Sequence, residues 1–308
     1  MSAAGQLNPA QIATPRKGMS TAWLYALLAF MIFAWGLNFV IAKIALREIP
    51  PMIVASVRTV FAGVFILPIF LWRTRGERRS WPARDIAALL GLGILGAVGN
   101  QVLFVLGLSR TSVAHASVAV ALSPITVLII AAVAGQESIT SRKVAGMLVA
   151  LSGIIALQLG RTGGRGPTLT GDLIVLLSGT VFALYAVFGK SLTALYGSLT
   201  ANTFAYTGGA VMMLPLVLWQ ANTFDLSRVS PAAWASVAYM AVFSAVIAYL
   251  IFYYALQRLP ASRVSALSYL QPVIATVLAA LILGEHPGAG FAVACALVLT
   301  GVFLTERG

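Results

Sequence analysis

Long apolar stretches alternate with short polar connections from residue 20 to the end of the chain. Each stretch has about 20 residues, which at ~1.5 Å per residue is long enough for a helix to cross a hydrocarbon layer roughly 30 Å thick. The pattern predicts an all-α membrane protein with ten transmembrane helices. They fall at about 20–42, 51–72, 85–108, 113–134 and 143–160, and then at about 171–191, 200–219, 232–256, 262–283 and 288–305.

The second five helices repeat the first five in register. At an offset of 147 residues Lys43 aligns with Lys190 and Trp72 with Trp219. The later helices align when the offset is increased by one residue. At an offset of 148 the aligned pairs include Phe104 with Phe252, Pro124 with Pro272, Glu137 with Glu285 and Gly153 with Gly301. Apolar composition alone does not align Pro, Trp and Gly across five helices.

This repeat divides the chain into four parts: a disordered cytoplasmic tail (1–19), a first repeat (20–160), a Gly-rich linker (161–170) and a second repeat (171–308). Five spans is an odd number, so the second repeat enters the membrane from the opposite side and the two repeats are inverted. A change in the relative tilt of inverted repeats exposes a central site first to one side and then to the other.

Composition places these helices in a bilayer. Hydrophobic residues make up 60 % of the 308 residues and charged residues 9 %, against roughly 45–50 % and about 25 % in an average soluble domain. The formal net charge is +12, but the basic residues lie in short connections without a long basic face, so we expect no nucleic-acid partner. The expected partners are membrane lipid and a small-molecule substrate.

Basic residues also predict the topology. Counted on alternate sides of the ten spans, 13 Lys and Arg residues lie on one side and 6 on the other. Cytoplasmic connections carry the excess, so both termini are expected in the cytoplasm and the protein in the inner (plasma) membrane. Residues 2–17 lack the apolar segment of a signal peptide, and the single Cys295 cannot form an intramolecular disulfide.

Several motifs resemble those of the drug/metabolite transporter superfamily, in particular its ten-helix branch with two EamA-type repeats. The matching residues are Trp35-Gly36, Asn38, Arg58, the segments that end at Pro124 and Pro272, and Gly284-Glu285. Within that branch the chain looks closest to the YddG-like exporters of aromatic amino acids. The resemblance implies a basket-like bundle around a central cavity, with the fifth and tenth helices at its periphery.

The first helix of each repeat carries a candidate wall for a transport pathway. Trp35, Asn38 and Phe39 lie three and four residues apart and so share one face of the first helix. Phe182, Tyr185 and Phe188 repeat the pattern on the sixth helix. The aromatic residues could instead belong to the core or face lipid. Asn38 is harder to place there, because a buried amide without a partner costs roughly 2–7 kcal/mol.

Further polar positions continue this pathway on other helices. Asn100 and Tyr249 lie on the third and eighth helices, Ser117 on the fourth, and Ser265 and Tyr269 on the ninth. A polar stripe within a membrane must face protein or water. The alternative role for Asn100 is an interhelical hydrogen bond that only holds the bundle together.

Prolines and two basic residues complete the set of candidates. Pro124 and Pro272 each remove a helical donor, so they are either hinges for opening and closing or static packing kinks. His115 could bind a carboxylate or titrate near neutral pH, or it could sit at the interface and do neither. Arg58, about 10 Å inside the end of the second helix, is interpreted as structural.

All eight acidic residues fall in tails, connections or helix ends. Without a mid-membrane carboxylate, the usual group for proton coupling is missing, and a facilitator that moves a metabolite down its gradient is the favoured hypothesis. A permanent cation would find no counter-ion, so a neutral or zwitterionic aromatic solute fits better. The sequence also lacks an HExxH motif and a paired-carboxylate motif, so we expect no enzyme, metal or cofactor.

We therefore predict a secondary transporter that exports amino acids, aromatic or neutral ones, and related metabolites by alternating access. A multidrug or other metabolite carrier of the same superfamily is the alternative, followed by a membrane scaffold that transports nothing. Direction and substrate rest on the resemblance. Small-residue faces at Gly146-x3-Ala150 and Ala292-x3-Ala296 allow close helix contacts within a monomer or in a weak homodimer.

Overall fold

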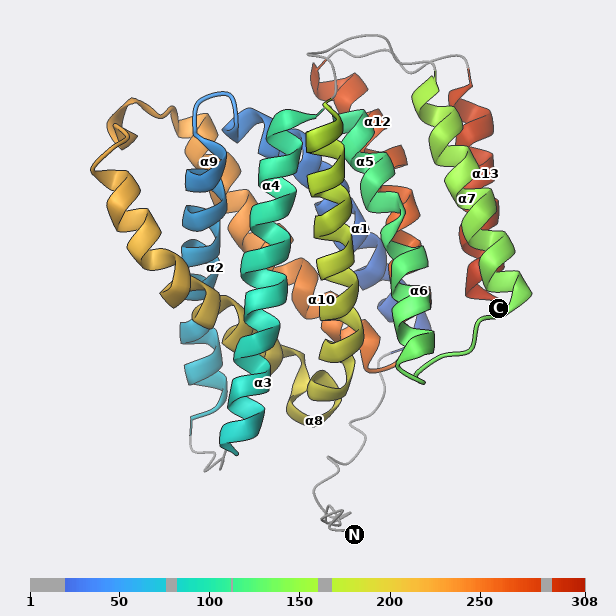
Figure 1. The fold of residues 1–308 in the computed structure, drawn as a ribbon, viewed down its shortest axis with the longest axis horizontal. Helices are drawn as coiled ribbons and strands as arrows, with labels where there is room; N and C mark the ends of the chain where they lie inside the picture. The colour runs from blue at the N-terminus through green and yellow to red at the C-terminus, as the bar shows by residue number, and fades with distance from the viewer. Residues whose placement is uncertain (1–19, 76–81, 112, 160–167, 284–289, 308) are drawn as a thin grey trace.

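Every regular element in the described part of the chain is helical (Figure 1). The structure is a computed structural model that describes residues 20–75, 82–111, 113–159, 168–283 and 290–307. The predicted tail, residues 161–167 of the predicted linker and the Gly284-Glu285 motif lie outside these residues. The first half contains α1 (Thr21–Ala45), α2 (Pro51–Arg73), α3 (Ala83–Gly93), η2 (Ile94–Asn100), α4 (Gln101–Arg110), α5 (Val113–Ala121), α6 (Ser123–Val133) and α7 (Ser141–Leu159).

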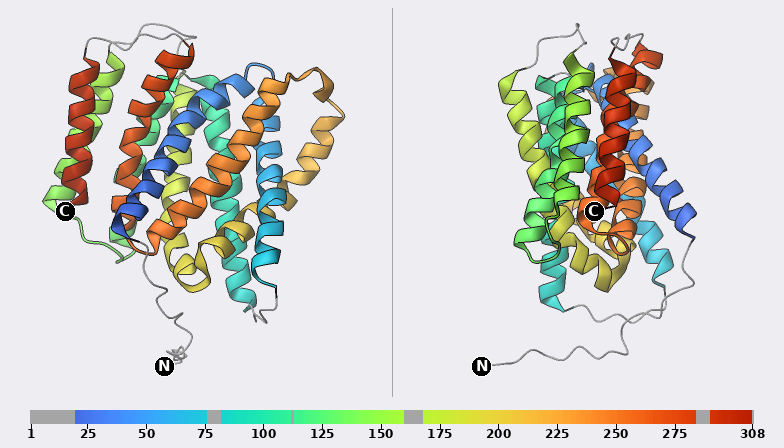
Figure 2. Two further views of the ribbon diagram at one scale, coloured as in Figure 1. Left: turned by 180° about the vertical axis from the view of Figure 1, so that it is seen from behind. Right: turned by 90° about the vertical axis from the view of Figure 1, so that its right-hand side faces the viewer.

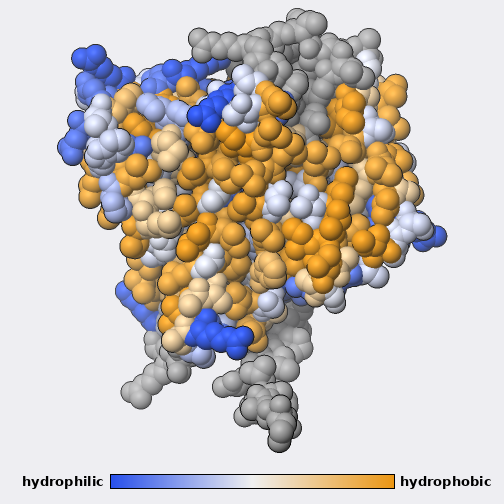
Figure 3. Space-filling view, viewed as in Figure 1, coloured by the Kyte–Doolittle hydropathy of each residue, from blue (hydrophilic) through white to orange (hydrophobic). Residues whose placement is uncertain are grey.

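The second half contains α8 (Leu169–Ala221), η3 (Leu226–Arg228), α9 (Pro231–Tyr239), η4 (Met240–Ile247), α10 (Ala248–Leu256), α11 (Ala261–Ala266), η5 (Leu267–Tyr269), α12 (Leu270–Leu283) and α13 (Phe291–Glu306). Six helical stretches among the described residues are long and apolar enough to cross a membrane. Figure 3 shows that the surface across the middle of one face is largely apolar, with hydrophilic residues gathered towards its ends. This distribution suits a lipid environment and confirms the all-α membrane class.

A π-helix interrupts one helix of each half. In the first half η2 separates α3 from α4, and in the second half η4 separates α9 from α10. Shifting η4 back by 148 residues puts it on residues 92–99, within two residues of η2. Because π-helices account for well under about 1 % of residues, their occurrence at equivalent places is a structural signature of the repeat that hydropathy did not reveal.

Each half also contains a helix that is broken just before a proline. The predicted span 113–134 is divided into α5 and α6 at Leu122, with Pro124 in the first turn of α6. The predicted span 262–283 is divided into α11 and α12 by the 3₁₀ turn η5, with Pro272 in the first turn of α12. Proline is tolerated in a first turn, where its missing N–H has no helical partner to lose.

Helix α8 joins two spans that the sequence predicts as separate helices, at 171–191 and 200–219. It bends at Gly197, whose φ of 82° is non-helical and lies in a region that glycine reaches without steric cost. Gly197 is equivalent to Pro50, which lies in the break between α1 and α2. The bend in α8 therefore repeats that connection.

Helices α7 and α13 pack together at one side of the molecule (Figures 1 and 2). A Cβ atom on Gly301 would lie 2.5 Å from the Gly146 carbonyl oxygen, and one on Gly153 would lie 2.8 Å from the Ala294 carbonyl oxygen. At the offset of 148, Gly146 is equivalent to Ala294 and Gly153 to Gly301, so the two contacts are equivalent. The two helices thus cross through reciprocal contacts between equivalent small residues.

Hydrogen bonds to Glu137, which also forms an ion pair, join the two halves at the end of the bundle where α6 ends and α11 begins. Glu137 accepts hydrogen bonds from the backbone N–H and the hydroxyl of Ser262, and its carboxylate lies 3.2 Å from the Lys143 ammonium. Burial raises the pKa of the Glu137 carboxyl, but the Ser262 and Lys143 contacts outweigh burial and hold it below its ordinary value. The charged carboxylate is thus the stable form.

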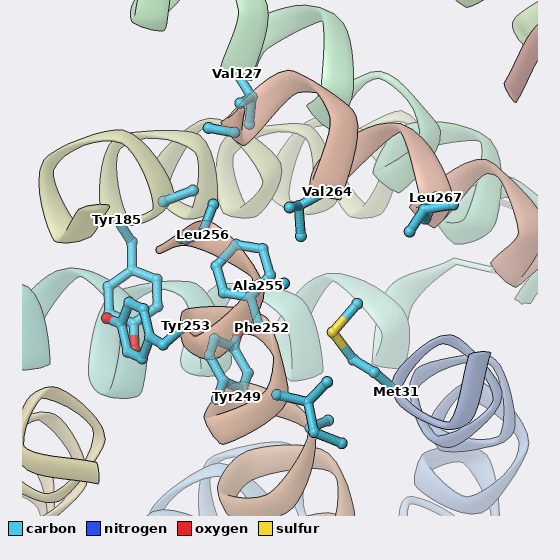
Figure 4. Close-up of a cluster of buried hydrophobic side chains, with 14 of the residues drawn as sticks. Met31, Val127, Tyr185, Tyr249, Phe252, Tyr253, Ala255, Leu256, Val264 and Leu267 are labelled. Atoms are coloured by element: carbon cyan, nitrogen blue, oxygen red, sulfur yellow. The ribbon is translucent and has the colours of Figure 1, made fainter. Parts of the chain in front are cut away.

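Between these connections the core is largely aromatic at its centre. Figure 4 shows Tyr185 of α8 beside Tyr253 of α10, and their ring centroids are 5.2 Å apart. Phe252 and Tyr249 continue the cluster towards Met31 of α1. Such edge-on and tilted aromatic pairs fix the relative positions of α1, α8 and α10.

We expect Gly301→Ala to destabilise the protein by about 1–3 kcal/mol, because the added methyl overpacks the contact between α7 and α13. Gly91→Ala is the matched control, since a Cβ there meets nothing within 4 Å and Gly91 is helical. Thermal unfolding of the purified protein in detergent checks this. Equal midpoints for the two variants would contradict the proposed close packing.

We expect Glu137→Gln to cost about 1.5–3 kcal/mol at neutral pH through the loss of charge-assisted hydrogen bonds. Because the folded-state pKa is lowered, this stabilisation is complete above pH of about 4.5 and is lost as the pH falls through the folded value. The wild type and the variant should converge in unfolding midpoint as the pH is lowered. Asp225→Asn, at an exposed ion pair, is the control and should change little. A difference in unfolding midpoint between the wild type and Glu137→Gln that stays constant from pH 7 to pH 3 would contradict a stabilising charge on Glu137.

Candidate functional site

A cavity of about 80 Å³ lies between helices of both halves. Helices α1, α2, α4, α5 and α6 and the π-helix η2 contribute from the first half, and α8, η4, α10, η5 and α12 from the second. Its lining residues are Trp35, Asn38, Phe39, Arg58, Asn100, Gln101, Phe104, Val120, Ser123, Ser178, Gly179, Phe182, Ser244, Tyr249, Ser268 and Gln271. The lining combines aromatic rings, amides, hydroxyls and one guanidinium.

Equivalent residues of the two halves meet at this cavity. The rings of Trp35 and Phe182, which are 147 residues apart, have centroids 6.0 Å from each other. Gln101 donates a hydrogen bond of 3.1 Å to the hydroxyl of Tyr249, which is 148 residues further on. A residue contacts its own equivalent only where the two halves face each other across a local symmetry axis. The cavity therefore lies where equivalent parts of the two halves face each other.

Trp35 anchors an aromatic wall. Its indole N–H donates to the carbonyl of Ser244 in η4 at 3.1 Å, which satisfies the only polar group of the side chain. Its ring contacts Phe182 edge-to-face, Tyr249 edge-to-face at 5.3 Å and Phe252 in a tilted arrangement. The wall presents ring edges and faces to a solute without any carboxylate beside them.

A chain of hydrogen bonds links the amides behind this wall. The side-chain amide of Gln101 donates to the Tyr249 hydroxyl, which donates to the side-chain oxygen Oδ1 of Asn100 at 3.2 Å. The side-chain Nδ2 of Asn100 then donates to the backbone carbonyl of Ser178 at 3.0 Å. Asn100 is therefore both a lining residue and an interhelical tie. The two roles that the sequence left open coexist in one side chain.

Arg58 is the charged residue in the lining. Its side chain is 1 % exposed and donates one hydrogen bond, from Nη2 to the carbonyl of Met240 at 3.3 Å. Nε and Nη1 are buried without a partner. None of the lining residues is Asp or Glu, so no lining carboxylate balances the charge of the guanidinium.

A hydrogen-bond acceptor without a partner also occurs in this lining. The Asn38 side chain is 6 % exposed, and its Oδ1 atom has no hydrogen-bond partner. The lining therefore offers both donors and acceptors to a solute.

The structure brings five of the predicted pathway residues together, namely Trp35, Asn38, Phe39, Asn100 and Tyr249. Four others, Ser117, Tyr185, Ser265 and Tyr269, are buried but do not line this cavity. Pro124 and Pro272 lie at the two broken helices. The side chain of His115 lies outside the described residues.

Phe188 faces away from the cavity and is 51 % exposed. Steps of three residues do not keep a constant face, because each falls about 60° short of a full turn. After two such steps Phe188 is rotated by about 120° from Phe182, which does line the cavity. Phe182 is thus the aromatic residue of α8 that extends the Trp35 wall.

Sequence reasoning did not select several lining residues, including Gln101, Ser123, Ser178, Ser244 and Gln271. Arg58 was interpreted as structural. A charged side chain inside an apolar span is itself a signal for function, and that signal singles out Arg58. For metal binding, the described residues contain no cluster of three His, Cys, Asp or Glu side chains.

A protein-family comparison decides the class of this helical repeat. The EamA-like transporter family matches residues 22–158 and again residues 169–307. The chain belongs to the EamA-like transporter family. The predicted EamA-type drug/metabolite transporter is confirmed, and this chain is a multi-pass membrane protein with two EamA repeats.

Individual relatives extend over most of the chain. An "uncharacterized transporter" of Archaeoglobus fulgidus is 29 % identical over 285 residues, covering 92 % of this chain and 98 % of the relative. A "probable terminal-alkyne amino-acid exporter" of Streptantibioticus cattleyicolor is 32 % identical over 232 residues, covering 75 % of this chain and 76 % of the relative. A crystal structure with a TM-score of 0.73 and 21 % identity covers 94 % of this chain and 98 % of its own, and it supports the fold. The names of the relatives agree with a non-enzymatic protein.

We expect Tyr249→Phe to destabilise this EamA-family protein by about 1–3 kcal/mol, because it leaves the Gln101 and Asn100 amides without their shared partner. Tyr269→Phe is the matched control. The Tyr269 hydroxyl is buried without a partner, so its removal should be neutral or stabilising. Thermal unfolding of both variants measures the difference, and equal effects would contradict the hydrogen-bond chain.

Proposed function

We propose that this protein is a secondary transporter that exports amino acids, chiefly aromatic or neutral ones, and related small metabolites by alternating access. The observation that carries the proposal is the cavity, which lies between the two halves and is lined by equivalent residues from each. Polar groups without partners inside an apolar bundle indicate a site for a solute. The family assignment supplies transport as the general activity.

The proposed alternating access uses ten spans in two inverted sets of five. The helices of the structure support this arrangement, because they form ten spans when α8 is divided at Gly197 and consecutive segments of one helix are counted together. The segments counted together are α3–η2–α4, α5–α6, α9–η4–α10 and α11–η5–α12. The reciprocal contacts of Gly146 with Gly301 and of Gly153 with Ala294 suit a local two-fold axis. An odd number of spans in each half places such an axis in the membrane plane.

The cavity is smaller than the proposed solutes. An engineered protein cavity that binds benzene measures about 150 Å³, nearly twice the 80 Å³ here. An aromatic amino acid would therefore bind only after the halves separate. The breaks before Pro124 and Pro272 are the proposed hinges, because a broken helix bends without losing further backbone hydrogen bonds.

Orientation, direction and substrate class complete the proposal. The basic connections favour cytoplasmic termini in an inner membrane. Export is supported by the relative named as an amino-acid exporter and by the likeness of the motifs to YddG-like exporters. Without an acidic lining residue to take up a proton, the favoured mode is facilitated movement down a concentration gradient. For the same reason a carrier of cationic drugs is the weaker alternative.

Flux of a labelled amino acid through purified protein in liposomes tests this function. Phenylalanine, tryptophan and tyrosine should compete with labelled phenylalanine better than lysine or glutamate does, and collapsing a pH gradient should leave the flux unchanged. Equal competition by all five amino acids would overturn the substrate class. No flux of any of them would overturn amino-acid transport itself.

We expect Ser268→Leu to weaken substrate binding and flux by about 5- to 150-fold, because the larger side chain fills the cavity that Ser268 lines. Ser152→Leu is the matched control, since Ser152 lies on α7 with an exposed side chain. Proteoliposome flux, normalised to the amount of folded protein, provides the measurement. Unchanged flux in Ser268→Leu would show that the solute does not use this cavity.

A further inference from the structure

We infer that Arg58 binds a carboxylate group of the transported solute and that a carboxylate is therefore a required part of the substrate. The inference rests on the proposed transport function and makes the substrate class narrower. It depends on the position, burial and unused hydrogen-bonding groups of one side chain. It also replaces the structural interpretation of Arg58 that the sequence favoured.

The guanidinium is buried against the cavity with most of its donors unused. Arg58 is 1 % exposed, lines the cavity and donates only from Nη2, to the carbonyl of Met240 at the start of η4. Its Nε and Nη1 atoms have no partner and together carry three N–H groups. A carboxylate in the cavity is the type of acceptor that these donors match in charge and geometry.

No other charged residue lines the cavity, so the lining does not neutralise Arg58. Arginine remains protonated under all ordinary conditions, and a buried charge without a counter-ion destabilises a protein strongly. The Lys143 ammonium, in contrast, is paired with Glu137. A charge left unpaired beside a cavity is the arrangement expected when the missing counter-ion belongs to the solute.

The rest of the lining fits the remainder of an amino acid. The Oδ1 atom of Asn38, a lining residue, is an acceptor without a partner, so an ammonium group has a candidate partner there. The rings of Trp35 and Phe182 provide an apolar surface for a side chain. Asn38 is neutral, so it binds an ammonium group less strongly than Arg58 binds a carboxylate.

The site is asymmetric although the frame is repeated. The residue equivalent to Arg58 at the offset of 147 is Ala205, and the residue equivalent to Asn38 is Tyr185. The anion-binding group thus comes from the first half alone. A solute would keep one orientation relative to the two halves while the cavity opens to one side and then to the other.

The first experiment measures anion binding without any need for transport. The full-length protein in detergent is heated in solutions of sodium acetate or sodium chloride at equal ionic strength, and the unfolding midpoint is recorded. Acetate should raise the midpoint of the wild type more than chloride does, because a ligand that binds only the folded state stabilises it. Equal midpoints in the two salts would overturn carboxylate binding at Arg58.

Variants locate this effect. Arg58→Met should abolish the acetate response and raise the basal midpoint, because it removes an unpaired buried charge and leaves an apolar side chain of similar length. Arg58→Lys should keep a reduced response, whereas Arg47→Gln, at an exposed basic residue, should respond as the wild type does. A lower midpoint for Arg58→Met together with an intact acetate response would show a purely structural Arg58 and overturn the inference.

The second experiment uses four solutes that share a phenyl ring: phenylalanine, 3-phenylpropionate, phenylalaninamide and phenethylamine. Competition with phenylalanine flux in proteoliposomes should be about ten- to a hundredfold weaker for the two solutes without a carboxylate. Equal competition by all four would overturn the inference while leaving transport intact. An acetate response without any amino-acid flux would instead overturn the proposed function and leave the carboxylate site standing.

Discussion

A bilayer offers no hydrogen-bond partners, so the polar groups of this bundle must be satisfied within the protein. The π-helix η4 provides much of that satisfaction, because its irregular turn leaves carbonyls open to side chains from other helices. Ser244 accepts from Trp35, Met240 from Arg58 and Val246 from Asn202. These bonds tie α1, α2 and α8 to one segment of the second half. The aromatic wall and the cavity beside it depend on them.

The repeated frame and the unrepeated lining serve different purposes. Reciprocal glycine contacts, paired π-helices and paired helix breaks recur in both halves because each stabilises a shared backbone geometry. The lining departs from the repeat where a solute would touch it, with Arg58 in one half and Ala205 in the other. Under the proposed alternating access, the repeated frame gives two equivalent conformations, and the asymmetric lining lets both hold one asymmetric molecule.

Polar groups with partners and polar groups without them have different energetic consequences in this protein. Glu137, Lys143 and Ser262 form a closed set of contacts that joins the two halves at one end of the bundle. Arg58 and Asn38, both nearly inaccessible to solvent, keep polar atoms without partners beside a cavity. The first arrangement contributes stability, whereas the second costs stability, which a binding site offsets only when its ligand is present.

Hydropathy and the internal repeat by themselves determined the helical membrane class, the two repeated halves and the places near Pro124 and Pro272 where helices break, because these features depend on local composition and on proline chemistry. Only the tertiary structure decided which side chains share the cavity. A π-turn adds a residue to a helix and rotates everything beyond it by about 100°, so a straight-helix pattern did not predict that Gln101 lines the cavity together with Asn100. The unpaired state of Arg58 was likewise invisible in sequence, because the absence of a partner is a property of all the helices around it.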